Sequence, residues 1–285
     1  MSAPFLNEDN SSEVVAQRLL AANDGRLPQF LVSLVSHLHQ AVKEARPTPA
    51  DWRQAIAFLT DVGHASDDKR QEWILLSDLL GVTALVEEIN SRRPRGATPN
   101  TARGPFYRPD APRYEAGASI SLDGVGEPLA VSGTVRDLDG LPIAGAIVET
   151  WQANSEGLYE NQQPDGQPDF NLRGSFATGR DGRFRYATIK PSGYGVPGDG
   201  PVGELLGRIG YPLLRPAHIG FVVSADGFET ITTHVYERDD PNLYLDAVFG
   251  VRPELVADVR RDGRRAWTLE FDFVMVRTRK GRRAA

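Results

Sequence analysis

Beyond residue 104, Asp-Gly pairs separate short segments in which apolar and polar residues alternate. Three such pairs are Asp139-Gly140, Asp181-Gly182 and Asp226-Gly227. Alternation with a period of two predicts strands with one buried face, and Asp-Gly is typical of the tight turns of hairpins. Short strands at regular spacing, with glycine-rich turns, predict a mainly β chain with a C-terminal β-sandwich. The segment "LEFDFVMV" is expected to form the last strand.

The first hundred residues have a different pattern, with apolar residues at helical spacing. Residues 11–23, 27–45 and 48–63 are expected to form helices, and residues 68–93 one longer helix. Thr48 followed by Pro49 is a strong start signal for the third helix. The Gly- and Pro-rich segment near residue 100 ends this pattern. Two domains are therefore expected, a helical one over 1–103 and the β-sandwich over 104–285.

Composition excludes several classes of function. The chain has 285 residues, a formal net charge of −6 and no cysteine, so disulfides, thiolate nucleophiles and cysteine metal ligands are excluded. The charge gives no reason to expect a nucleic-acid partner. No apolar run has membrane length and no signal pattern follows Met1, so we expect no membrane span and a cytoplasmic location. The basic residues 277–285 are expected to form a solvated tail.

The histidines are few. They are His37, His39, His64, His218 and His234. The first three are interpreted as ordinary helix or helix-end residues. The last two lie on the two arms of the hairpin predicted around Asp226, whose register would pair them directly, whereas a shift of one residue would separate their faces. This position is compatible with two interpretations, one in which the two histidines only pack together and one in which they take part in function.

Two tyrosines lie where the backbone is irregular. Tyr159 follows Gly157 shortly after a predicted strand, and Tyr194 lies between Gly193 and Gly195. Tyrosines in such loops are most often structural. A phenolate is nevertheless a hard anionic ligand that suits Fe(III), and a bound cation would lower the pKa of the phenol.

Several longer motifs occur in order along the chain. They are "TARGPFYRPDAP", "GTVRDLDGLPIAGAIVETWQANSEGLY", "RGSFATGRDGRFRYATIKPSGYGVPGDGPVG", "RPAH" and "DAVFGV". Together they resemble the intradiol ring-cleaving dioxygenases, and "QQPDGQPDFNLRG" and "GFETITTHVY" resemble the hydroxyquinol 1,2-dioxygenase branch. The resemblance covers most of the chain. It implies an Fe(III) cofactor, with a small aromatic diol and O2 as substrates. The ring would open between its two hydroxyl-bearing carbons to a muconate- or maleylacetate-type product. It also implies a homodimer formed through the helical domain, with a phospholipid at the dimer interface.

The resemblance also implies the metal ligands. By motif they are Tyr159, Tyr194 and His218, and Gly220 stands where the family has a second histidine. Either a water or His234 is expected to complete the site. A Gly220→His replacement is expected to tighten iron binding.

Catalytic and substrate-binding roles follow in the same way. Tyr194 is expected to take a proton when the substrate displaces it, and Arg215 to stabilise negative charge on the ring. The implied substrate-binding residues are Leu75, Asp78, Gly104, Pro105, Phe106, Val196, Pro197, His234 and Val248. Arg103 either faces solvent or attracts an anionic group of the substrate.

Three functions stay open from the sequence, and one of them is altered oxygen or metal chemistry at a site with three ligands. The retained tyrosines, histidine and arginine favour an enzyme. Gly220 and Arg103 favour an impaired homologue that binds aromatic diols or another small molecule without cleaving them.

Overall fold

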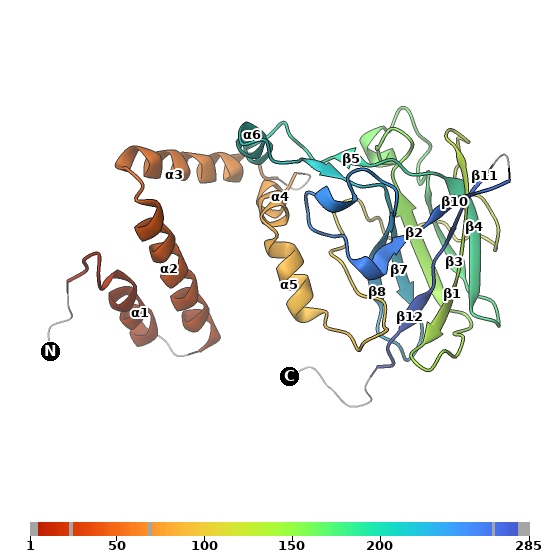
Figure 1. Cartoon of the computed structure of the whole chain (residues 1–285), viewed down its shortest axis with the longest axis horizontal. Helices are drawn as coiled ribbons and strands as arrows, with labels where there is room; N and C mark the ends of the chain where they lie inside the picture. The colour runs from red at the N-terminus through yellow and green to blue at the C-terminus, as the bar shows by residue number, and fades with distance from the viewer. Residues whose placement is uncertain (1–4, 23–24, 68–69, 264–265, 279–285) are drawn as a thin grey trace. The chain divides into compact units, whose positions relative to one another are not determined.

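The computed structural model describes residues 5–22, 25–67, 70–263 and 266–278. The predicted basic tail lies outside this description from residue 279 on. The chain divides into two compact units, residues 1–64 and 65–285, and each is described by itself (Figure 1). In the described ranges, no helix combines the length and the apolar character that a membrane span requires. The cytoplasmic location stays a prediction.

The first unit is helical, as expected. Its helices are α1 (Ser11–Ala22), α2 (Arg26–Ala45) and α3 (Pro49–His64). The start signal of α3 is confirmed, because Thr48 and Asp51 form a reciprocal cap. The Thr48 Oγ1 accepts the Asp51 N–H at 3.2 Å and the Asp51 carboxylate accepts the Thr48 N–H at 2.9 Å. Such a cap pairs two donors that the first helical turn leaves free.

The second unit begins with two short helices, where one long helix was expected. They are α4 (Glu72–Leu79) and α5 (Val82–Asn90). The prediction of a continuous helix over 68–93 is wrong because Gly81 has a φ of 71°, a left-handed conformation that ends one helix before the next begins. The apolar periodicity runs through this break and therefore conceals it.

In the described residues, the β-sandwich consists of two five-stranded sheets. In the first, β10 (Val259–Asp262), β11 (Ala266–Glu270), β1 (Pro128–Asp137) and β12 (Phe273–Met275) follow one another, and β4 (Arg183–Ile189) also pairs with β1. The second has the order β3 (Arg173–Ala177), β2 (Ile147–Gln152), β7 (His218–Ser224), β8 (Ile231–Glu237) and β9 (Val256–Ala257). Side chains from both sheets, among them Val131, Phe176, Phe221 and Phe273, form one buried core.

Smaller elements connect these strands. They are β5 (Tyr194–Gly195), β6 (Leu214–Arg215), α6 (Pro201–Arg208) and three 3₁₀ turns at Glu160–Gln162, Leu243–Leu245 and Pro253–Leu255. Strands β5 and β6 pair with each other and form a separate two-stranded sheet.

The Asp-Gly turns are present, but two of them do not join paired strands. Gly140, Gly182 and Gly227 have φ values of 80°, 72° and 82°, as turn glycines do. The first connects β1 to β2 and the second β3 to β4, and in each case the two strands belong to different sheets. The hairpins expected there are wrong, because a sandwich also connects strands across its two layers.

The third turn does join a hairpin, but the predicted register is wrong by two residues. Strand β7 pairs with β8 so that His218 faces Tyr236 and Gly220 faces His234. The turn is centred on Gly227 and not on Asp226, since Val223 pairs with Ile231. Since the shift is even, His218 and His234 still lie on one face of the sheet.

The expected last strand is interrupted as well. Strands β11 and β12 both pair in parallel with β1, and Phe271 and Asp272 lie between them. Gly133 of β1 faces this interruption. A Cβ atom at Gly133 would lie 1.8 Å from the Phe271 carbonyl oxygen, so the strands approach this closely only because residue 133 has no side chain.

We expect Gly133→Ala to lower the free energy of unfolding by about 3 kcal/mol, because the added methyl must displace backbone rather than a flexible side chain. Gly207→Ala is the matched control, since a Cβ at this helical glycine meets nothing within 4 Å. The control should not lose stability, because alanine favours helix. Urea unfolding followed by circular dichroism measures both. Equal stability of the two variants would contradict the close approach.

Candidate active site

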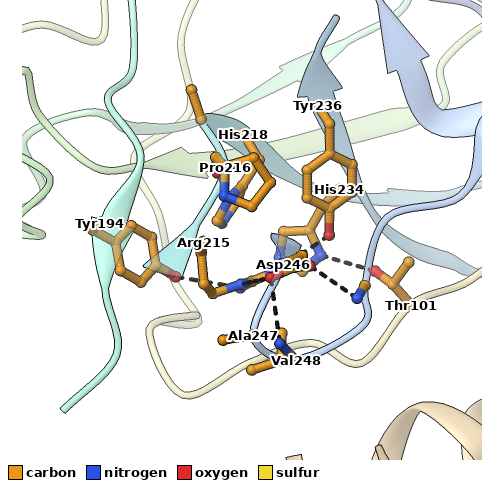
Figure 2. A network of polar contacts seen from close by, with 12 residues as sticks. Thr101, Tyr194, Arg215, Pro216, His218, His234, Tyr236, Asp246, Ala247 and Val248 are labelled. Carbon is orange, nitrogen blue, oxygen red and sulfur yellow. Dashed lines mark hydrogen bonds and ion pairs between the residues drawn. The ribbon is translucent and has the colours of Figure 1, made fainter. Parts of the chain in front are cut away.

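Two buried imidazoles lie side by side on the second sheet. His218 begins β7, His234 lies in the middle of β8, and each side chain is about 3% exposed. Their ring centres are 5.1 Å apart and their planes are nearly perpendicular, at 87°. Figure 2 shows both rings on the same side of the hairpin. The face shared by two strands thus presents two aromatic nitrogen bases to one region.

Two phenol rings continue this cluster. The ring centre of Tyr194 is 5.4 Å from that of His218, and the ring centre of Tyr159 is 5.7 Å from that of Tyr194. Tyr159 is fully buried and Tyr194 half-buried. The structure therefore brings together the three residues that the motifs imply as metal ligands, with His234 as a fourth neighbour.

Glycines allow the two tyrosine segments to meet. Gly157 has a φ of 80°, and a Cβ there would lie 2.8 Å from the Gly193 carbonyl oxygen and 2.9 Å from the Tyr194 Cβ. A Cβ at Gly193 would lie 2.6 Å from the Arg215 carbonyl oxygen. The loop that carries Tyr194 can approach both neighbours because these positions lack a side chain. Pairing of β5 with β6 then sets Tyr194 opposite Arg215.

His218 has the tautomer of a metal ligand. Its Nδ1 lies 2.8 Å from the Pro216 carbonyl oxygen, which can only accept, so Nδ1 carries the hydrogen and Nε2 a lone pair. This Nε2 is buried and has no hydrogen-bond partner in the described part of the chain. Burial, reinforced by the charge of Arg215, lowers the pKa of His218 well below its ordinary value. The imidazole is therefore neutral at neutral pH, the form that binds metals.

Arg215 is a buried cation at the edge of the cluster. Its Nη1 donates to the Tyr194 hydroxyl at 3.3 Å, its Nη2 to the Tyr236 hydroxyl at 3.2 Å, and its Nε to the Asp246 carboxylate at 3.0 Å (Figure 2). The same carboxylate accepts the N–H of Gly250 at 2.9 Å. A buried charge is stable when it is paired and hydrogen-bonded in this way. The guanidinium is thus fixed beside the Tyr194 oxygen.

The phenol of Tyr159 needs a cation to ionise. Burial, followed by the neighbouring Tyr194, raises the pKa of Tyr159 well above its ordinary value, while Arg215 and Arg173 act in the opposite direction. A trivalent metal ion would reverse this balance, because a coordinated phenol loses its proton far more readily. Two phenol oxygens and a neutral imidazole nitrogen are a donor set that suits Fe(III).

The residues implied in substrate binding differ in how closely they join the cluster. Phe106 stacks on Tyr159, with ring centres 4.3 Å apart and planes at 15°. Val248 donates its N–H to Asp246 at 3.4 Å. Asp78 on α4 is half-buried; burial raises the pKa of its carboxyl, whereas a hydrogen bond from Thr83 and the charge of Arg215 lower it.

The other implied residues are less closely connected. Leu75 and Val196 are half-buried, whereas Gly104, Pro105 and Pro197 are exposed. Within the part of the chain that the structure describes, no hydrogen bond or ring contact joins these residues to the four rings. Their substrate-binding roles stay predictions. Arg103 is exposed, and its guanidinium lies 4.8 Å from the centre of the Tyr107 ring, where a cation–π contact holds it.

Comparison with known proteins identifies the family. A family model described as "Dioxygenase" matches residues 102–277, and one described as "Catechol dioxygenase N terminus" matches residues 24–98. A hydroxyquinol 1,2-dioxygenase of a Rhizobium species is 48% identical, over 96% of this chain and 97% of the relative. The chain belongs to the intradiol ring-cleaving dioxygenases. This confirms the family resemblance and the fold class.

Other relatives agree with this membership. A 6-chlorohydroxyquinol 1,2-dioxygenase of Cupriavidus pinatubonensis is 45% identical, over 94% of this chain and 97% of the relative. The crystal structure of hydroxyquinol 1,2-dioxygenase from Pseudomonas putida matches with a TM-score of 0.90 at 38% identity, over 95% of this chain and 99% of that one. A catechol 1,2-dioxygenase structure from Acinetobacter matches with a TM-score of 0.80 at 28% identity, covering 98% and 96% of the two chains.

The space beside Gly220 is already filled. Trp151 of β2 is its cross-strand neighbour, and a Cβ at position 220 would lie 2.3 Å from the indole Cε2. The indole also lies edge-on to His234, with ring centres 5.7 Å apart at 82°. A histidine at 220 therefore requires Trp151 to move, so the direct gain expected from Gly220→His does not follow from the structure.

Sequence reasoning missed four residues of this cluster. They are Thr101, Trp151, Tyr236 and Asp246. Tyr236 could have been found from its position two residues after His234, which gives it the same face of β8. Asp246 lies in the "DAVFGV" motif, but nothing in the motif shows that it pairs with Arg215. The contacts of Thr101 and Trp151 are long-range, and no local pattern contains them.

We expect Gly220→Ala to destabilise the protein by about 2 to 4 kcal/mol, since the methyl must displace the ring of Trp151 from a buried position. Gly198→Ala is the matched control, because the nearest atom to a Cβ there is a leucine methyl at an ordinary 3.7 Å. The melting temperatures of the two metal-free variants measure the difference. A Gly220→Ala protein as stable as the control would show that the indole does not occupy this space.

Proposed function

We propose that the chain is an Fe(III)-dependent dioxygenase that opens hydroxyquinol or a related catechol between its two hydroxyl-bearing carbons. The single observation that carries this proposal is the buried, unpartnered Nε2 of His218 beside the phenols of Tyr159 and Tyr194. The relatives named hydroxyquinol 1,2-dioxygenase support the choice of substrate. Both atoms of O2 would enter the ring-opened muconate- or maleylacetate-type product.

The metal would be held by Tyr159, Tyr194 and His218. When bound, Fe(III) supplies Lewis acidity and a template that orients the diol. Tyr159 is buried under Phe106 and its ring is fixed, which suits a permanent ligand. Tyr194 is half-buried on a two-residue strand, which suits a ligand that leaves when the diol binds.

Residues of this chain would also accept a proton and stabilise negative charge during the reaction. A catechol that binds as a dianion would lose two protons, of which the Tyr194 oxygen would accept one and solvent the other. Arg215 donates a hydrogen bond to this oxygen, so its positive charge would lie beside the Tyr194 oxygen and the bound substrate. Asp246 holds the guanidinium in place through its hydrogen bond to Nε.

The helical unit is proposed to form a homodimer, with a phospholipid at the interface. None of the 20 residues of α2 is buried within the chain. Its apolar residues recur at helical spacing and are 45 to 67% exposed at Leu27, Phe30, Leu34, Leu38 and Val42. A continuous apolar stripe of this kind is typical of a surface that another subunit or a lipid covers. The proposed helical part extends over 1–103, and the catalytic part over 104–285.

A second function is favoured by one observation. Gly220 supplies no ligand and Trp151 fills its place, which is compatible with a homologue that binds diols without cleaving them. Cleavage and binding are separable by experiment, because only cleavage consumes O2.

We expect the iron-loaded protein to consume one O2 per hydroxyquinol and to show the broad visible absorption of a tyrosinate bound to Fe(III). Tyr159→Phe should lose most of the absorption and the activity, because the ring remains and the ligand oxygen does not. Tyr186→Phe is the matched control, since Tyr186 is equally buried but lies in the sandwich core. Oxygen-electrode and absorption measurements test this. Coloured, substrate-binding protein without O2 uptake would support the second function instead.

We expect Asp78→Asn to lower kcat/KM for hydroxyquinol by about 10- to 100-fold and to change that for catechol little. The half-buried carboxylate can accept a hydrogen bond from the additional ring hydroxyl, and such a charged acceptor contributes roughly 1.5 to 3 kcal/mol. Steady-state kinetics with both substrates measure the ratio. A parallel loss on both substrates would assign Asp78 to the structure of the site rather than to substrate choice.

A further inference from the structure

We propose that His234 supplies a second imidazole to the metal centre, beside His218. The proposal rests on the ferric site proposed above and adds one ligand to it. It assigns the fourth protein ligand to β8, where the family resemblance places it on β7 at residue 220.

The register of the hairpin gives His234 the necessary position. His234 on β8 pairs directly with Gly220 on β7, and directly paired residues project from the same face of a sheet. Residues two apart share a face too, so His218 is its neighbour on that face. Residue 220, which lies between them on this face, has no side chain, and the Trp151 indole packs over its backbone instead.

The separation of the two rings fits a shared ion. Metal–nitrogen bonds to histidine are about 2.1 Å long, so two imidazoles that each bind one ion through a single nitrogen have ring centres roughly 5 Å apart. The centres of His218 and His234 are 5.1 Å apart. The rings of Tyr194 and His218 are adjacent as well, at 5.4 Å. No rearrangement of the backbone is needed to bring His234 to the cluster.

Thr101 positions the ring of His234. Its Oγ1 lies 2.8 Å from the His234 Nδ1 (Figure 2). A hydroxyl can accept the Nδ1 hydrogen, which leaves the lone pair on Nε2. Among the described residues, none forms a hydrogen bond with this Nε2. His218 shows the same arrangement, with Nδ1 held by the Pro216 carbonyl. Metal-binding histidines almost always donate their other ring N–H to such a partner.

The surroundings hold the ring of His234 in place. Trp151 contacts it edge-on and occupies the volume beside Gly220. The indole thus takes the place that a side chain at 220 would occupy and supports the imidazole that faces it. Water as the fourth ligand is the competing arrangement.

The test counts imidazoles at the iron. X-ray absorption fine structure of the Fe(III)-loaded full-length protein resolves the outer-shell scattering of coordinated imidazole rings. We expect two rings in the unaltered protein and one in His234→Gln, whose amide can still pair with Thr101. Loss of one of four ligands should also weaken Fe(III) binding by about 100-fold in competition with a chelator.

Controls separate this effect from loss of structure. His37→Gln on α2 should bind iron like the unaltered protein, and the melting temperature of metal-free His234→Gln shows whether it folds. If it does not fold, Thr101→Val is the second variant. It removes the hydroxyl that accepts from Nδ1, and we expect Fe(III) binding about tenfold weaker or more, in the range found when such a partner is lost.

The outcomes distinguish this inference from the proposed function. One imidazole in the unaltered protein, with iron binding and O2 uptake intact, would overturn the role of His234 and leave the dioxygenase proposal standing. Iron affinity unchanged in both His234→Gln and Thr101→Val would overturn it too. Failure of the unaltered protein to bind Fe(III) at all would overturn both.

Discussion

The pairing of β7 with β8 is the constraint on which the site depends. It fixes which side chains project from the catalytic face, and a slip of one residue would send His234 to the opposite face of the sheet while His218 stayed. Backbone hydrogen bonds of central strands resist such a slip, because both neighbours, β2 and β9, hold the hairpin in register. The geometry of the imidazoles is therefore a property of the sheet and not of a loop.

A buried positive charge complements the phenols. Arg215 donates through Nε, Nη1 and Nη2, so its charge is satisfied by Asp246 and two hydroxyls at little further cost. A charge fixed in this way needs no reorganisation when a neighbouring oxygen becomes negative, which is the condition for electrostatic catalysis. The arrangement also explains why Asp246, which touches no proposed substrate, belongs to the site.

Helix starts, helices and turns were predicted correctly where they depend only on residues close together in the sequence. Such cases are the start of α3 at Thr48, the helical segments of the first unit and the turn at Gly227. Predictions failed where the partner was distant in sequence. The strands around Gly140 alternate as a hairpin would, yet they belong to different sheets, since alternation reports a buried face and not the identity of the neighbour. The indole beside Gly220 is hidden from the sequence for the same reason.

The energetics of the cluster support the proposed metal ion. A buried nitrogen without a partner costs roughly 1 to 3 kcal/mol, and His218 carries one at Nε2. Unpartnered polar atoms also occur on Arg173 and Glu160, but these two side chains already form an ion pair with each other. The Nε2 of His218 instead belongs to the ring cluster that contains Tyr159, whose ionisation burial opposes. A cation would relieve both costs at once, by accepting the lone pair and stabilising the Tyr159 phenolate, whereas water could satisfy only the nitrogen.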